Sequence, residues 1–340
     1  MNRDQRLEFW DTLCSLDGAD LQKDCARLAE KVQFPRYLYR YRAVDTRNLT
    51  ALLRNRLYFS SANYFDDPFD TYLHINIPGM ISEFRANFST DAQLANLSNR
   101  LMEIAPLLKE DSSNFDAIVS DPYNLRKFYE GGLSHWFNDY ILKLRSSIRE
   151  DTWSICFSED GFNETLWLKY ADAYHGFALQ YDLADEASFH CGKHEKCQDC
   201  IISKTIRSLY PMVYSDQPYD ATHFAKYIML QDLKKQANAP LPQSLTDEIG
   251  SAVWERERTT LLKKLCHEPD QEWRMILGCN VESPVCLEWV PSGIILGLRM
   301  SPEDEALVLS IAKQAGIKTI FKSFVDVQNL LNCFSVDTTA

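Results

Sequence analysis

Short stretches that alternate between apolar and polar positions occur in three separate parts of the chain, and a period of two is typical of β-strands. The first part predicts strands at 37–42 (YLYRYR) and 57–61 (LYFSS), with a short helix over 46–56 between them. The other predicted strands lie at 153–157, 177–181, 212–215, 271–279, 285–290, 292–298 and 318–323. Strand regions that are so far apart in the chain indicate one discontinuous sheet.

Apolar residues at helical spacing predict the segments that precede the first strand. Residues 4–14 and 20–32 form two amphipathic patterns, and Pro35 ends this pair. Because no strand pattern occurs before position 37, we expect residues 1–35 to be a helical preface to the main domain.

Helical patterns also separate the groups of strands, with insertions at about 80–150 and 216–266. Residues 245–266 are expected to be helical throughout, and Ser301 is expected to cap a helix that ends at Gly316. Residues 36–340 are therefore predicted to form a single α+β domain with a central mixed or antiparallel sheet and large helical insertions.

Composition supports a folded protein with an acidic surface. Hydrophobic residues make up 45% of the 340 positions and charged residues 25%, which allows a packed core and argues against wholesale disorder. The net charge of −12 disfavours broad binding of nucleic acids, because an acidic surface repels a phosphate backbone.

The N-terminal region has no membrane-targeting pattern. No apolar run approaches the roughly 20 residues of a membrane-spanning helix. Residues 1–13 carry acidic side chains among their apolar positions and lack the apolar centre of a signal peptide. We expect a cytoplasmic protein that does not contact membranes.

A short loop over 190–200 is rich in metal-binding side chains. Soft ligands recur at every third position in this loop, namely Cys191, His194, Cys197 and Cys200. Zinc prefers four thiolate or imidazole ligands, and a C-x-x-C turn presents two of them. The spacing predicts a structural zinc site, and a reduced loop without metal is the alternative.

Residues 152–182 hold the most informative local pattern. A strand, a polar turn, a short helix and a second strand follow one another, and the unit keeps Trp153, Trp167 and His175 close together. Such a unit is typical of one wall of a pocket. A core position is the alternative for both tryptophans, since tryptophan commonly supplies buried area.

The chain resembles the bacterial family called "domain of unknown function 2971" over about residues 36–325. The resemblance is carried by six segments: YRYR at 39–42, LRNRLYFS at 53–60 with Leu52 before it, FDDPFD at 65–70, CFS at 156–158, LWLKYADAYHGF at 166–177 and DQEWR at 270–274, with IILG at 294–297 after them. Three positions depart from the family pattern. Asp66 replaces an asparagine, Lys169 replaces a histidine, and Asp270 replaces a glutamate.

The order of elements is more distantly similar to that of the ADP-ribosyltransferase fold. DNA-modifying ADP-ribosyltransferase toxins and tRNA 2′-phosphotransferases open with a strand, a helix and a short strand, as LYRYRAVDTRNLTALLRNRLYFS does. This resemblance implies an NAD-dependent enzyme of the glycosyltransferase class that modifies a macromolecule, either a protein or a nucleic acid. It also implies a role in toxicity or phage defence, with an antitoxin or regulatory protein that restrains the enzyme.

The same resemblance implies roles for particular side chains. Glu272 would be the catalytic carboxylate beside the NAD ribose, and His175 would serve as a base toward the acceptor. The side chains expected near NAD are Arg40, Arg42, Ser60, Ser61, Ser158, Trp167 and Tyr170. The two arginines are two positions apart, so they share one face of the sheet.

Other interpretations of the same residues stay open. Arg40 and Arg42 could pair with the acids of the 65–70 loop, and Glu272 could pair with Arg274 and do nothing chemical. A non-catalytic module that binds a nucleotide or a partner is one alternative function. A metal-dependent nucleic-acid hydrolase built on the acids of the 65–70 loop is the other.

Overall fold

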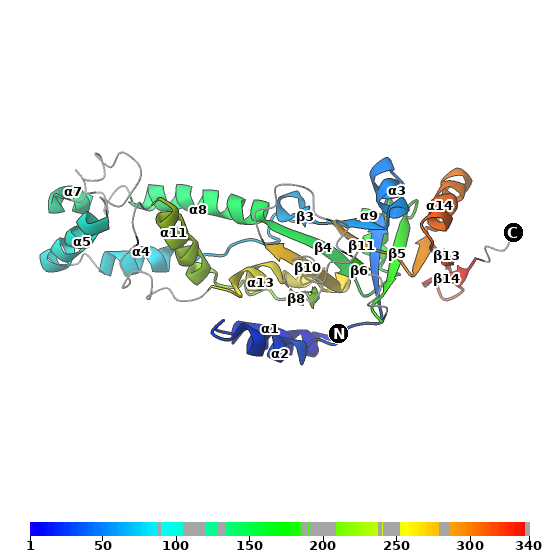
Figure 1. The fold of residues 1–340 in the computed structure, drawn as a ribbon, viewed down its shortest axis with the longest axis horizontal. Helices are drawn as coiled ribbons and strands as arrows, with labels where there is room; N and C mark the ends of the chain where they lie inside the picture. The colour runs from blue at the N-terminus through cyan, green and yellow to red at the C-terminus, as the bar shows by residue number, and fades with distance from the viewer. Residues whose placement is uncertain are drawn as a thin grey trace.

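The computed structural model describes residues 1–86, 90–104, 120–127, 133–184, 189–190, 209–236, 240, 252–278 and 286–336. Figure 1 shows an elongated molecule with a group of helices at one end, a sheet in the middle and the C-terminal strands at the other end. The predicted α+β class with a central mixed sheet is confirmed. The closer likeness to the ADP-ribosyltransferase fold stays a prediction.

The central sheet has nine strands in the order β14-β13-β12-β5-β1-β4-β10-β7, and β3 pairs with β4 beside this path. Their bounds are β1 Tyr37–Arg42, β3 Ser60–Ser61, β4 Thr152–Ser158, β5 Phe177–Asp182, β7 Leu209–Pro211, β10 Glu272–Gly278, β12 Gly293–Leu296, β13 Thr319–Val325 and β14 Leu331–Ser335. The strands pair antiparallel except for β12 and β13. These two are parallel because α14 (Pro302–Gln314) connects them.

The segment LYFSS, expected to be one strand, belongs to two different sheets. Residues Arg56–Tyr58 form β2, which pairs with β11 (Cys286–Trp289) in a three-stranded sheet completed by β6 (Phe189–His190). Ser60 and Ser61 form β3 and pair with β4. Phe59, which is 3% exposed, lies between the two strands, and its burial fixes the point where the chain changes sheets.

Helices pack on both faces of the sheet, α3 (Thr46–Leu53) and α14 on one face and α9 (Glu164–Tyr170) on the other. The other bounds are α4 Ile77–Ala86, α5 Asp91–Ile104, α7 Pro122–Lys127, α8 Leu133–Asp151 and α11 Thr222–Gln236. Helices α4, α5, α7, α8 and α11 gather at one end of the molecule, while α3 lies beside α14 (Figure 1). Throughout the described ranges, every helix is too short or too polar to cross a membrane.

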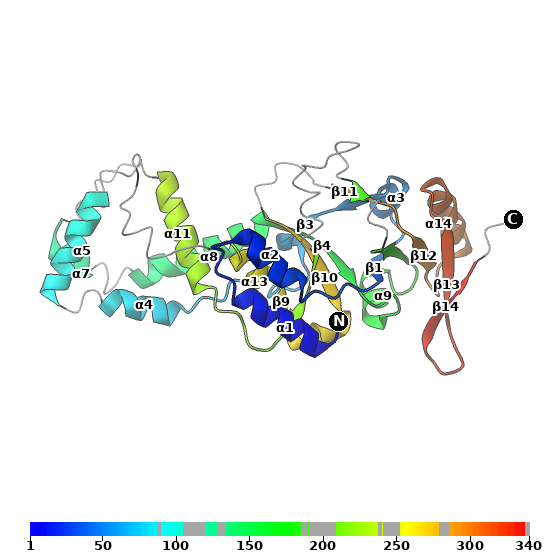
Figure 2. The ribbon, with the colours of Figure 1, turned by 60° about the horizontal axis from the view of Figure 1, so that its bottom comes forward.

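The preface forms the two predicted helices, α1 (Arg3–Cys14) and α2 (Leu21–Ala29). Asn2 and Asp20 cap them by accepting hydrogen bonds from backbone N–H groups of the first turn. Figure 2 shows both helices lying across α13 (Glu255–Thr260) and the nearby strand β9 (Leu262–Lys263). Apolar side chains of the preface pack into a core with β7, β8 (Val213–Tyr214) and β10, so the preface supports the edge of the sheet.

The prediction of one helix over 245–266 was wrong where the structure describes it. Helix α13 ends at Thr260, and Leu262 and Lys263 then pair with β8 as strand β9. A 3-10 helix, η6 (Leu265–Asp270), follows and contains Pro269, which cannot donate the backbone bond that a longer helix needs. Gln271 then adopts a left-handed backbone conformation, with φ 44°, and turns the chain into β10.

Candidate functional site

The sheet opens along one edge of β4. Strand β1 is in register with β4 through the single pair Tyr39–Ser158, and β3 is in register through Ser60–Ser154 and Ser61–Trp153. On the side away from β4, β1 pairs with β5 along its whole length, from Tyr37 to Arg42. A cavity of about 1050 Å³ lies where β1 and β3 separate. This volume is at the upper end of the range of about 300–1,000 Å³ that is usual for ligand pockets.

Most of the side chains expected near NAD line this cavity. Those that do are Arg40, Arg42, Ser60, Ser61, Ser158, Tyr170 and Glu272. They come from β1, β3, β4, α9 and β10, so chain segments more than 200 positions apart meet at one opening. Arg40 and Arg42 are two positions apart within strand β1, so they lie on one face of the sheet, and both line the cavity.

Trp167 and His175 are not among the side chains that line the cavity. Trp167 is fully buried in the core between α9 and the sheet, where its indole Nε1 donates to the Gly161 carbonyl at 3.0 Å and its ring stacks on Tyr174. His175 is exposed in the turn after α9, and its Nδ1 lies 2.8 Å from the Asp172 carbonyl oxygen. Trp167 and His175 therefore serve the core and the helix end, whereas Leu166, Lys169 and Tyr170 of the same segment line the cavity.

The arginine side chains of β1 have few partners. Arg40 is 9% exposed, its Nη2 lies 3.5 Å from the Tyr58 carbonyl oxygen, and its buried Nε has no hydrogen-bond partner. Arg42 donates to the Tyr41 carbonyl at 2.9 Å. Burial lowers the pKa of both groups, and the Arg40 cation contributes to lowering the pKa of Arg42 to about 9. With a pKa of about 9, Arg42 is still charged at pH 7, so this part of the cavity attracts an anion.

The acids of the 65–70 loop pair with other cations. Asp66 lies 3.2 Å from Lys169 Nζ, and Asp67 lies 3.3 Å from His267 Nε2. Asp70 accepts from Arg274 Nη1 at 2.7 Å. In the part of the chain that the structure describes, the proposed pairing of these acids with Arg40 and Arg42 therefore does not occur.

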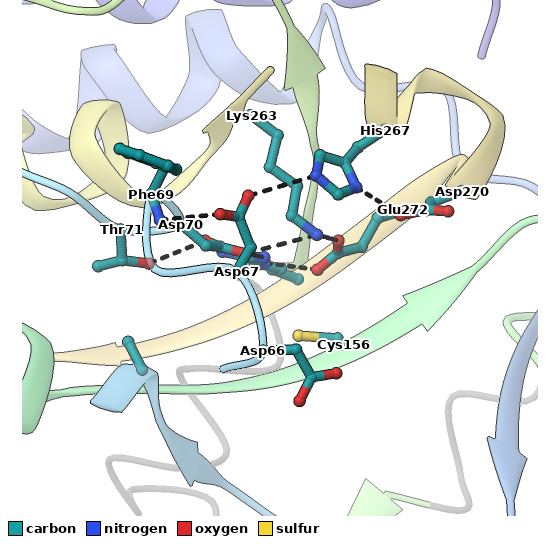
Figure 3. A network of polar contacts seen from close by, with 12 residues as sticks. Asp66, Asp67, Phe69, Asp70, Thr71, Cys156, Lys263, His267, Asp270 and Glu272 are labelled. Atoms are coloured by element: carbon teal, nitrogen blue, oxygen red, sulfur yellow. Dashed lines mark hydrogen bonds and ion pairs between the residues drawn. The ribbon is translucent and has the colours of Figure 1, made fainter. Parts of the chain in front are cut away.

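Glu272 begins β10, where it is in register with Ser158 of β4 and lines the cavity, and it is the centre of a buried network (Figure 3). One carboxylate oxygen accepts from Arg274 Nε at 2.6 Å and the other from Lys263 Nζ at 2.7 Å. Burial alone would raise the pKa of Glu272, but the Arg274 and Lys263 cations outweigh this effect and hold the pKa far below its usual range. Glu272 is therefore a permanently ionised carboxylate at neutral pH.

The backbone of Glu272 is fixed from two sides. Its N–H donates to the Tyr214 hydroxyl at 2.7 Å, and its carbonyl oxygen accepts from Arg6 Nη1 at 3.0 Å. Ser158 Oγ donates to the carbonyl of Asp270 at 2.7 Å, which holds the end of η6 against β4. The carboxylate thus has a defined position relative to the cavity.

Two of the serines act on the backbone. Ser61 Oγ donates to carbonyl oxygens of Arg149 and Glu150 at the end of α8, and Ser158 has the contact to Asp270 given above. Both hydroxyl groups therefore hold the cavity wall together. Cys156 lies on the same wall, and burial raises the pKa of its thiol to about 11, so it is protonated at neutral pH.

Several residues of the site were not predicted from the sequence. Lys263 and His267 take part in the network of Figure 3, and Arg47 from α3 lines the cavity beside the two arginines of β1. No periodic or motif signal marks Lys263, since it lies in the segment expected to be helical. The pairing of Glu272 with Arg274 was one of the open interpretations, and the structure confirms the contact.

The predicted zinc ligands Cys191, His194, Cys197 and Cys200 lie outside the described residues. Among the residues that are described, no group of three or more His, Cys, Asp or Glu side chains is arranged to hold a metal ion. Zinc and NAD both stay predictions.

Comparisons with known proteins do not place the chain in a family. No family model, curated protein or solved structure matches it. The resemblances described above stay predictions.

Proposed function

We propose that the cavity binds NAD and that the protein transfers ADP-ribose to a macromolecular acceptor. The observation that carries this proposal is that Arg40 and Arg42, whose guanidinium groups form no ion pair with any residue that the structure describes, meet the ionised carboxylate of Glu272 in one cavity of about 1050 Å³. A dinucleotide with a central diphosphate needs cations near its middle and a carboxylate near the ribose that reacts.

The chemistry assigns different tasks to the arginines of β1 and to Glu272. The arginines would hold the diphosphate through paired N–H donors. In the reaction the bond between the ribose C1″ and the nicotinamide nitrogen breaks, and its electron pair leaves with nicotinamide. The acceptor then forms a bond to C1″ and releases a proton to solvent. Glu272 would accept a hydrogen bond from the 2″-hydroxyl of the nicotinamide ribose and stabilise the positive charge that develops on that ring.

A non-catalytic binding module is the second candidate, and one observation favours it. Both carboxylate oxygens of Glu272 already accept hydrogen bonds from Lys263 and Arg274. A carboxylate held in this way can stabilise the fold without taking part in a reaction. The metal-dependent hydrolase is not favoured, because each of the three acids already contacts a nitrogen-bearing side chain: Asp66 contacts Lys169, Asp67 contacts His267 and Asp70 contacts Arg274.

Nicotinamide release tests the enzymatic proposal. The full chain is incubated with NAD, with and without a bacterial lysate as the source of acceptor, and free nicotinamide is measured by chromatography. Loss of the charge in Glu272→Gln is expected to reduce the rate about 100-fold or more, as removal of one stabilising group in a transition state commonly does. Glu268→Gln is the matched control, because Glu268 lies on η6 with its side chain 40% exposed and outside the cavity lining.

The outcomes separate the two candidates. A rate unchanged in Glu272→Gln removes this residue from catalysis. NAD binding that depends on Arg40, measured by calorimetry and without any nicotinamide release, supports the binding module instead. Loss of nicotinamide release on chelation of metal ions contradicts both.

A further inference from the structure

A second chamber of about 310 Å³ adjoins the main cavity beneath α3. The two cavities share Arg40, Arg42 and Arg47, while Asn55 and Arg56 line the chamber and not the main cavity. No Asp or Glu is among the described residues that line the chamber. A chain with a net charge of −12 therefore contains a small, strongly cationic compartment.

The donors in this chamber are not neutralised by the protein. Along the described chain, Arg40, Arg42 and Arg47 form no ion pair, and the buried Arg40 Nε has no acceptor. The Arg47 cation helps to lower the pKa of both Arg40 and Arg42, which places the three guanidinium groups close together. A buried donor without a partner is rare in folded proteins, and here Arg40 Nε, beside two further guanidinium groups, points to an anionic ligand.

The other cations near the chamber have acidic neighbours. Lys169 pairs with Asp66 at 3.2 Å, and Arg56 lies opposite Glu288 in the β2–β11 pairing. The strongest anion attraction therefore comes from the three unpaired arginines. A phosphate group suits them better than a carboxylate, since it carries up to two charges and three oxygens that accept from planar guanidinium forks.

One further atom of the chamber lacks a partner. Asn55 Oδ1 is buried and accepts no hydrogen bond, although its Nδ2 donates to the Ala315 carbonyl at 3.0 Å. An acceptor beside a cluster of donors fits a ligand that carries a hydroxyl group close to its phosphate. The small volume admits one phosphate and the sugar attached to it, not a polymer.

We propose that this chamber binds a phosphate monoester on a ribose, held by Arg40, Arg42 and Arg47 with Asn55 Oδ1 accepting from a sugar hydroxyl. This inference depends on the proposed function in one respect only, namely that the ligand of the adjoining main cavity is NAD or NADP. Two sources share this chemistry: the 2′-phosphate of NADP, and a separate ribose phosphate that binds beside NAD.

Calorimetric titrations of the full chain at low salt test the proposal, with ribose 5-phosphate, NAD and NADP as probes. Arg47→Ala removes an exposed guanidinium group and is expected to weaken ribose 5-phosphate binding about tenfold. Arg56→Ala is expected to weaken it by a smaller factor and to leave NAD affinity unchanged. Arg54→Ala is the matched control, because Arg54 is an exposed arginine at the C-terminal end of α3 and lines neither cavity.

The probes identify the source of the phosphate. Tighter binding of NADP than of NAD, with the difference lost in Arg47→Ala and reduced in Arg56→Ala, assigns the chamber to the 2′-phosphate. Equal binding of the two dinucleotides, with ribose 5-phosphate binding in the presence of NAD, assigns it to a second ligand.

The proposal is overturned if the unmodified chain neither binds ribose 5-phosphate nor distinguishes NADP from NAD. It is also overturned if Arg54→Ala weakens binding as much as Arg47→Ala, since the effect would then be one of general charge. Failure of nicotinamide release together with ribose 5-phosphate binding would reject the enzymatic proposal and leave this one in place.

Discussion

At the scale of single residues, Arg274 holds together the buried network around Glu272. Its side chain is 1% exposed and donates to Asp70, to Glu272 and to the Thr260 carbonyl. Two carboxylates and two cations, with Lys263 as the fourth member, make a buried group whose formal charges cancel. Removal of one member leaves a buried charge without compensation.

Arg274→Met is therefore expected to lower the free energy of unfolding by about 3–5 kcal/mol, a size typical of a broken buried pair. Urea denaturation followed by circular dichroism measures this change. Lys169→Met is the comparison, because the Lys169–Asp66 pair has side chains 42% and 56% exposed and should contribute less than about 1 kcal/mol. Equal losses in the two variants would contradict a special role of the network.

The sequence predicted the residues of the cavity wall well where they lie in a strand with a clear alternating pattern. Arg40 and Arg42 alternate within β1, so their common face followed from the period of two. Trp167 was expected near NAD and His175 as a base toward the acceptor, and the structure puts them in the core and in an exposed turn. Lys263 could not be predicted, because its position depends on the pairing of β9 with β8.

At the scale of elements, helix α1 is coupled to the strand that carries Glu272. Arg6, which is 4% exposed, donates to the carbonyl oxygens of Met212 and Glu272 and to the Glu159 carboxylate. Trp273 Nε1 donates to the same carboxylate. A helix from the preface therefore fixes the backbone at the start of β10.

Arg6→Ala is expected to lower the free energy of unfolding by about 2–3 kcal/mol, because it removes charge-assisted hydrogen bonds from buried acceptors. Hydrogen exchange should also become faster for the amides of β10 than for those of β13. Arg3→Ala is the control on the same helix, since Arg3 is 57% exposed and has one ion pair at 3.7 Å. Unchanged exchange in β10 with Arg6→Ala would show that α1 is not coupled to the site.

Elements with strong local signals were predicted with nearly the observed bounds. Strand β1 and helix α14 are examples, and α14 has the expected Ser301 cap and is closed by Ala315 and by Gly316, whose φ is 82°. The region 252–270 differs, because short tertiary pairings and Pro269 replace the expected helix. Local pattern could not show that LYFSS serves two sheets, since the division depends on partners at 152–158 and 286–289.

At the scale of the whole molecule, the buried network links stability to pH. The pKa values of Asp70 and Glu272 are lowered in the folded state, because nearby cations outweigh the effect of burial. In the unfolded chain these groups titrate near their ordinary values of about 4. Their contribution to stability is therefore complete above about pH 4 and is lost as the pH falls toward the lower folded pKa.

The difference in unfolding free energy between the unmodified chain and Glu272→Gln should accordingly be constant from pH 7 to about pH 5 and shrink below about pH 4. Urea midpoints at a series of pH values measure this difference. Glu268→Gln should show no such dependence, because Glu268 is exposed and outside the network. A difference that grows on acidification would mean that the carboxylate of Glu272 does not have a lowered pKa.

The change of sheet at Phe59 has a mechanical consequence. Tyr58 and Ser60 both line the main cavity, yet one is held by β11 and the other by β4. Only one residue, anchored in the core, separates these two attachments. Any ligand that widens the gap must rotate the peptides on either side of Phe59, so this residue acts as the hinge that limits how far the two walls can part.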